Sequence, residues 1–175
     1  MSLKGIFTYT IRAVGFAAVV GGAYWLILHM CGKKAKCADV LAIMYLSAAA
    51  EIIALRLGAG RVQRMIKWIP MKTTLEELRG GAWAFVYHVC GNLAWFVPLG
   101  MILAWKKPKW TLLQIIISGA AFSAMLELLQ FALSTGMTDV DDVILNALGT
   151  IPGAISMRLY RKKKNNYCNC ARNRI

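Results

Sequence analysis

The longest uncharged stretch of the chain spans residues 80–105 and reads GGAWAFVYHVCGNLAWFVPLGMILAW. It holds 26 consecutive positions without Asp, Glu, Lys or Arg. Because about 20 apolar residues in an α-helix cross the hydrocarbon core of a bilayer, this stretch predicts a transmembrane helix. Residues 13–30 and 110–125 lack the same charged residues. The sequence therefore predicts a polytopic membrane protein.

The composition of the 175-residue chain agrees with this class, with 58% apolar residues, 17% charged residues and a mean hydropathy of +0.53. Soluble domains usually have about 45–50% apolar and about 25% charged residues. A disordered chain, a disulfide scaffold and an ordinary cytosolic enzyme are thereby excluded. The net charge of +13 does not indicate nucleic-acid binding, because the basic residues cluster at predicted helix ends, where they meet anionic lipid headgroups.

We predict an all-α transmembrane helical bundle with about five spans. These cover about residues 8–31, 38–57, 82–105, 110–134 and 141–158. Residues 1–57 form two N-terminal spans, residues 58–160 form a core with the other three, and residues 161–175 form a basic cytoplasmic tail.

The segment 61–70 is predicted to be an amphipathic helix in the membrane interface. Apolar residues recur there at i, i+3, i+4 and i+7, starting from Val62, and basic residues that include Arg61 and Arg64 lie between them. This pattern is typical of a basic interfacial helix, which Pro70 would end. A solvated loop is the alternative.

The topology follows from where Lys and Arg are concentrated. The loops at 33–36 and 106–109 and the tail from residue 158 carry most of them. The positive-inside rule places these segments in the cytoplasm, and the N-terminus is then external. The basic residues between 56 and 79 argue against this orientation, unless that segment lies on the outer membrane surface.

The five cysteines cannot all pair, and we expect reduced thiols. Cys168 and Cys170 have no His or second Cys pair nearby to complete a zinc site. The sequence therefore predicts neither a metal nor a cofactor.

Candidate functional residues are the polar side chains inside the predicted spans or directly next to them. A charge at mid-membrane costs about 2.5–3.5 kcal/mol on insertion scales, so one that is retained usually faces a protein interior or a wet cavity. The spacing places one polar stripe on each of three helices, and we predict that these stripes form one pocket opening outward. The residues are His88, Asn92, Glu127, Gln130, Asp139, Asp142 and Asn146.

Structural roles are the alternative for several of these residues. Gln130 and Asn146 suit interhelical hydrogen bonds, and a lone His88 is often a packing residue. Asp139 or Asp141 suits the N-terminus of the last span as a helix cap. Gly149 and Gly153 form a small-residue face that allows close helix approach.

Three segments of the chain carry a resemblance to a known family: NLAWFVPLG at 92–100, ELLQ at 127–130 and DVDDVILNALG at 139–149. They resemble the successive signatures of the VanZ-like membrane-protein family. WIPMK at 68–72 resembles the weaker upstream motif of that family. The resemblance covers roughly residues 61–157.

The resemblance implies a helical bundle in the bacterial cytoplasmic membrane and, for the family's namesake, low-level resistance to the glycopeptide teicoplanin. It implies no known reaction. Many members have an Arg shortly before the acidic run, whereas this chain has Gly136, Met137 and Thr138 there.

The function we favour is binding of a lipid-linked or anionic cell-envelope component at the outer leaflet, with membrane lipids as partners and a contribution to glycopeptide (teicoplanin) resistance. Arg61, Arg64 and Lys72 would hold phosphate oxygens. Asn92, Glu127 and Asp142 would orient the headgroup.

Three other functions stay open. An intramembrane hydrolase or transferase acting on a lipid phosphate would use Glu127 as general base, Asp142 to hold a divalent cation and His88 as proton shuttle. The chain has no recognisable nucleophile triad, paired-His metal motif or Gly-rich phosphate loop to support it. A small proton-coupled transporter would also need buried carboxylates, and a purely structural partner would use the glycine face.

Overall fold

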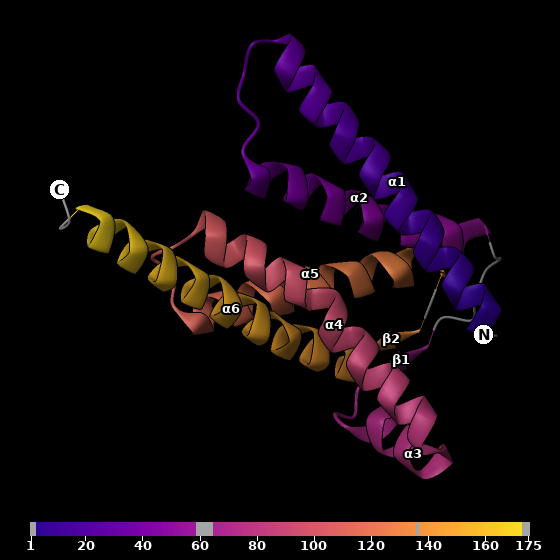
Figure 1. Ribbon diagram of the computed structural model, residues 1–175. Coiled ribbons are helices and arrows are strands. Elements are labelled where there is room, and N and C mark those ends of the chain that lie inside the picture. The colour runs from indigo at the N-terminus through magenta and orange to yellow at the C-terminus, as the bar shows by residue number, and fades with distance from the viewer. Residues whose placement is uncertain (1–2, 59–64, 136, 173–175) are drawn as a thin grey trace. The chain divides into compact units, whose positions relative to one another are not determined.

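The computed structural model describes residues 3–58, 65–135 and 137–172. Six helices and one pair of two-residue strands are formed by these residues (Figure 1). By its internal contacts the chain divides into two compact units. The first unit comprises the described residues within 1–68 and 125–139, and the second unit those within 69–124 and 140–175.

The first unit contains α1 (Leu3–Met30) and α2 (Cys37–Gly58), which pack against each other. Gly21 allows their close approach, because a Cβ there would lie 2.9 Å from the sulfur of Met44. α1 is followed by a turn with Gly32, whose φ of 67° is easily adopted only by glycine. The N–H of Lys33 then donates to the carbonyl of Leu28 at 2.8 Å, which satisfies an otherwise unpaired carbonyl of the last turn.

The two strands also belong to the first unit. β1 (Ile66–Lys67) pairs in parallel with β2 (Thr138–Asp139), with Ile66 opposite Thr138. The N–H of Thr138 donates to the carbonyl of Met65 at 3.0 Å, which extends the pairing by one residue. This short pair joins segments that lie about seventy residues apart in the sequence.

The second unit is built on α4 (Ala82–Lys106) and α6 (Val140–Arg172), which run side by side (Figure 1). Gly149 and Gly153 lie against α4, because a Cβ on either would come within 3.0 Å of α4 backbone atoms. The predicted small-residue face is therefore confirmed, and α4 is its partner. α5 (Leu112–Ala132) contributes its residues up to Ala124 to this unit.

The apolar core of the second unit lies where these helices are closest. Phe96 is 1% exposed, and Ile115 is fully buried in a cluster with Ala104, Ala154 and Met157. At the end of this cluster the guanidinium of Arg158 donates to the carbonyl of Trp110 at 2.7 Å.

The predicted all-α membrane fold is confirmed. Four of the described helices contain a stretch long and apolar enough to cross a membrane, at Ile11–Met30, Cys37–Ala54, Ala82–Lys106 and Leu112–Ala132. These match the first four predicted spans. The fifth, 141–158, is helical within α6 but is not one of these four, so its crossing of the membrane stays a prediction.

The interfacial helix predicted over 61–70 is wrong in its described part. Residues 61–64 lie outside the described residues, and residues 65–70 contain β1 and a turn instead of a helix. Pairing with β2 competes with helix formation here, and Pro70 cannot supply an N–H to a continuing helix. The amphipathic helix is α3 (Lys72–Gly80), which starts two residues after Pro70.

Candidate functional site

His88 lies between two carboxylates in the second unit. Its Nδ1 is 3.5 Å from Oε2 of Glu77, and its Nε2 is 3.5 Å from Oδ1 of Asp142. The three side chains come from α4, α3 and α6, and the imidazole is 15% exposed. Helices from separate parts of the chain therefore converge on one imidazole ring.

Asn92 joins this arrangement from the next turn of α4. Residues four apart lie on the same helix face, and the Nδ2 of Asn92 donates to Oδ1 of Asp142 at 2.7 Å. The structure thus brings together three predicted site residues, His88, Asn92 and Asp142. With Glu77 they are called the histidine cluster below.

Two buried atoms of the histidine cluster make no hydrogen bond to any described residue: Oε2 of Glu77 and Nε2 of His88. Oε2 of Glu77 lies 3.5 Å from the imidazole, and Nε2 of His88 lies 3.5 Å from the carboxylate of Asp142, and both distances exceed the usual 2.7–3.2 Å of a hydrogen bond. Buried polar atoms without a hydrogen bond are rare in folded proteins, so each such atom needs a physical explanation. Recognition of a polar ligand is one such explanation.

Asp141, next to the cluster in sequence, holds α3 in place. Its fully buried carboxylate accepts hydrogen bonds from the N–H of Met71, and from the N–H and Oγ1 of Thr74 at 3.0 Å each. The first N–H groups of a helix have no partner within it, so Asp141 acts as their cap. The sequence predicted Asp139 or Asp141 as a cap of the last span, whereas the hydrogen bonds of Asp141 to Met71 and Thr74 cap α3.

This cap also positions Glu77. Thr74 and Glu77 are three residues apart on α3, about one helical turn, so fixing Thr74 brings Glu77 to the imidazole. The neighbouring residues Asp141 and Asp142 therefore attach α6 to α3 and to α4, respectively.

The histidine cluster has the chemical groups for proton transfer and for hydrogen-bonding recognition. An imidazole can take a proton at one ring nitrogen and release one at the other, and each nitrogen of His88 faces a carboxylate. No group of three or more metal-ligating side chains suited to an ion is found among the described residues.

Glu127 and Asp139 lie in the first unit and stabilise the strand pair. Oε2 of the buried Glu127 accepts a hydrogen bond from the N–H of Asp139 at 3.2 Å. The carboxylate of Asp139 is 3.8 Å from Nζ of Lys67, its neighbour across the pair. Because Glu127 belongs to a different unit from Asp142, their sharing of one pocket stays a prediction.

Other predicted site residues have different surroundings. Asn146 is buried, and its Nδ2 donates to Oγ of Ser123 at 2.8 Å, as an interhelical hydrogen bond does. Gln130 accepts the N–H of Thr135 at its backbone carbonyl. Lys72 is exposed with its Nζ 3.9 Å from Glu76. The last two candidates, Arg61 and Arg64, lie outside the described residues.

Glu77 is the cluster residue that the sequence did not predict, because it lies outside the predicted spans and the only candidates between residues 58 and 81 were the basic residues Arg61, Arg64 and Lys72. A signal for its helix exists, since Thr74 and Glu77 match the pattern Ser/Thr-x-x-Glu that often marks a helix start. Applied to residues 72–80, that pattern would have predicted a helix, but one that starts at Thr74 instead of Lys72.

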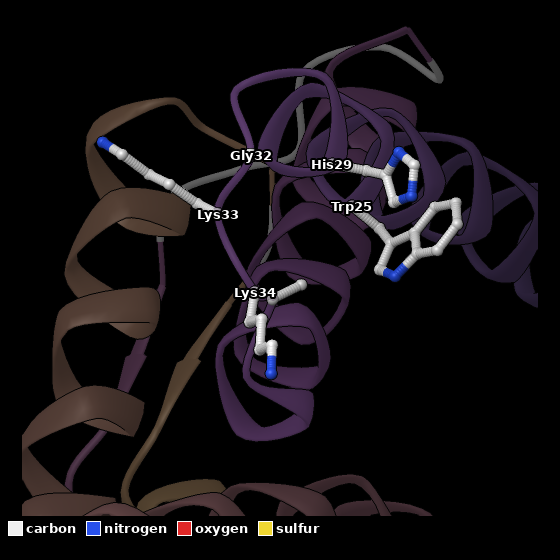
Figure 2. A pocket seen from close by; sticks show the side chains of 6 residues that line it. Trp25, His29, Gly32, Lys33 and Lys34 are labelled. Atoms are coloured by element: carbon white, nitrogen blue, oxygen red, sulfur yellow. The ribbon is translucent and has the colours of Figure 1, made fainter.

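A separate hollow of about 530 Å³ lies in the first unit, where α1 ends (Figure 2). The rings of Trp25 and His29 stack there with centroids 5.4 Å apart. Lys33 and Lys34 also line the hollow, and Lys33 extends away from the ring pair. None of the predicted site residues lines this hollow.

A family model described as VanZ/LLP1 matches residues 37–161. The chain belongs to the VanZ/LLP1 family. The matched region of this VanZ-family protein includes α3, α4, α5 and all four residues of the histidine cluster. No curated protein and no solved structure matches the chain.

Proposed function

We propose that this VanZ-family membrane protein binds the headgroup of a lipid-linked cell-envelope component at the outer leaflet of the bacterial cytoplasmic membrane. By doing so it contributes to resistance to glycopeptides such as teicoplanin. The observation that carries the proposal is the pair of buried atoms on Glu77 and His88 that make no hydrogen bond to the described residues. A ligand with hydrogen-bonding groups would satisfy both.

The chemistry of the histidine cluster supports a headgroup that bears hydroxyl or amino groups. Two carboxylates, one imidazole and one amide offer more acceptors than donors, and carboxylates repel a bare phosphate. Sugar hydroxyls and amines donate hydrogen bonds to such oxygens. Between a lipid-linked and a purely anionic component, the described residues therefore favour the lipid-linked one.

The polar cluster also lies among apolar helices, which supports a functional role. Ionisable groups in membrane helices are expensive and usually mark a site of function. His88 and Asn92 lie within α4, a candidate membrane span, and Asp142 faces them from α6.

A second candidate function is hydrolysis of the bound component or transfer from it. The position of His88 between two carboxylates favours it, because such an imidazole can act as general acid and base. In this case His88 would move protons, while Asn92 and Asp142 would orient the headgroup.

The test compares the lipids that copurify with the wild type, Asp142→Asn and Glu76→Gln, identified by mass spectrometry. Glu76 is the matched control, because it is an acid on α3 with a 56% exposed side chain outside the cluster. Hydrogen bonds to charged groups contribute about 1.5–3 kcal/mol, so we expect Asp142→Asn to retain at least about tenfold less of the lipid-linked species.

Glu76→Gln should retain that species as the wild type does. Identical lipid content in all three proteins would contradict the proposal. His88→Gln separates the two functions, because an enzyme would then keep the bound lipid intact while the wild type converts it.

A further inference from the structure

The inner face of α3 is held by the rest of the second unit. Thr73 and Thr74 are 7% and 4% exposed, Thr74 is bonded to Asp141, and Glu77 meets His88. At 100° per residue, these residues share one side of the helix. α3 is therefore a docked element and not a free surface loop.

A second face of α3 is apolar and exposed. Leu75 and Leu78 are three residues apart within α3, which places them in one stripe, and Met71 directly precedes the helix. They are 49%, 50% and 45% exposed, respectively. An apolar stripe of this kind on a helix rich in charged residues indicates a non-aqueous neighbour.

A third face of α3 is charged. Lys72 and Arg79 are seven residues apart and lie on one side of the helix, adjacent to the apolar stripe. Both are exposed. Glu76, farther from the stripe, has a 56% exposed side chain. Basic residues flanking an apolar stripe are the arrangement with which interfacial helices meet lipid phosphates.

The chain places α3 at the edge of the bilayer. α3 ends at Gly80, and the candidate span α4 begins at Ala82 after the single residue Gly81. Figure 1 shows α3 next to the start of α4. Nine helical residues span about 13 Å, too few for a hydrocarbon core of about 30 Å. Trp83 and Tyr87 on the first turns of α4 are 87% and 54% exposed, as aromatic residues at a membrane interface are.

We propose that α3 is a membrane-surface helix, with its apolar stripe in the acyl-chain boundary of the bilayer and Lys72 and Arg79 at the lipid phosphates. The bilayer is the one neighbour that matches an apolar face, an adjacent basic edge and a position next to a membrane span. α3 then connects the lipid surface with the histidine cluster through Glu77. This inference does not depend on which headgroup the cluster binds.

The experiment measures the membrane depth of single residues on α3 in the full-length protein. A fluorophore is attached to one cysteine at Leu75, Leu78 or Glu76, in a background in which the native cysteines are replaced by serine. The labelled proteins are reconstituted into phosphatidylglycerol and phosphatidylcholine vesicles. Quenching by a spin label on the lipid acyl chain is compared with quenching by iodide in water.

We expect the labels at Leu75 and Leu78 to be quenched severalfold more by the lipid-borne spin label than the label at Glu76, with the reverse order for iodide. Equal access of iodide to all three positions would overturn the proposal. Protection of Leu75 from both quenchers would also overturn it, because a protein surface would then cover the stripe.

A second pair of variants tests the same surface without labels. Leu75→Asn with Leu78→Asn leaves the buried Thr74 and the partly buried Glu77 unchanged, and should abolish the stabilisation of the protein by these vesicles relative to detergent. Lys72→Gln with Arg79→Gln should remove the part of that stabilisation that requires phosphatidylglycerol. Full stabilisation of both double variants would contradict a lipid-bound α3.

Discussion

At the scale of single residues, the adjacent acids Asp141 and Asp142 have different roles. Asp141 is completely buried and accepts bonds from Met71 and Thr74. Asp142 is 26% exposed and meets Asn92 and His88. Successive helix residues point about 100° apart, so these two adjacent residues of α6 contact two different helices, α3 and α4. The first acid serves structure, and the second belongs to the candidate site.

This difference predicts opposite phenotypes for two isosteric changes. Asp141→Asn should lower the stability of the folded protein by about 1.5–3 kcal/mol, because a charged acceptor of three hydrogen bonds is lost. Asp142→Asn should leave the melting temperature close to that of the wild type and abolish the resistance phenotype. Thermal unfolding in detergent and glycopeptide susceptibility of expressing cells measure the two effects. Equal destabilisation by both changes would refute this assignment.

At the scale of elements, the α4–α6 interface depends on the absence of side chains at two positions of α6. A Cβ on Gly149 would lie 2.9 Å from the Cα of Leu93, and a Cβ on Gly153 would lie 2.9 Å from the N of Met101. Backbone atoms cannot give way as a flexible side chain can. The histidine cluster is formed by these same two helices together with α3, so their spacing also determines the geometry of the cluster.

Gly153→Ala is therefore expected to destabilise the protein by about 1–3 kcal/mol, the usual effect of overpacking. Gly91→Ala is the matched control, because Gly91 also lies in a helix of this interface, α4, and a Cβ there meets nothing within 4 Å. Since glycine is a poor helix former, that control should be neutral or slightly stabilising. The measurement is the melting temperature of each variant. Equal melting temperatures for Gly153→Ala and Gly91→Ala would mean that α4 and α6 are not in close contact at Gly153.

At the scale of the whole molecule, the basic loops predict the orientation in the membrane. Cys31 and Cys37 are exposed and flank the lysine-rich loop at 33–36. If this loop is cytoplasmic, an impermeant maleimide should not label a variant that keeps only Cys31 in intact cells, but should label it after lysis. A cysteine introduced at Ser134 should be labelled from outside. Labelling of Cys31 in sealed cells would reverse the orientation.

Much of the fold was predictable because its signals are local in the sequence. An uncharged run of sufficient length determines a membrane helix by composition alone, and four predicted spans agree with the structure. The contact of Asn92 with Asp142 was also accessible, since both belong to polar stripes on predicted helices. The close approach at Gly153 followed from small residues spaced by four.

The sequence by itself thus determined the helical membrane class, the positions of four spans and the polar residues that meet on α4 and α6. Only the tertiary structure decided where α3 begins, that Glu77 reaches His88, and that Ile66 pairs with Thr138. Hydrophobic burial acts on each segment according to its own composition. A helix cap such as Asp141 or a two-residue strand is instead stabilised by a partner about seventy residues away, which no local pattern contains.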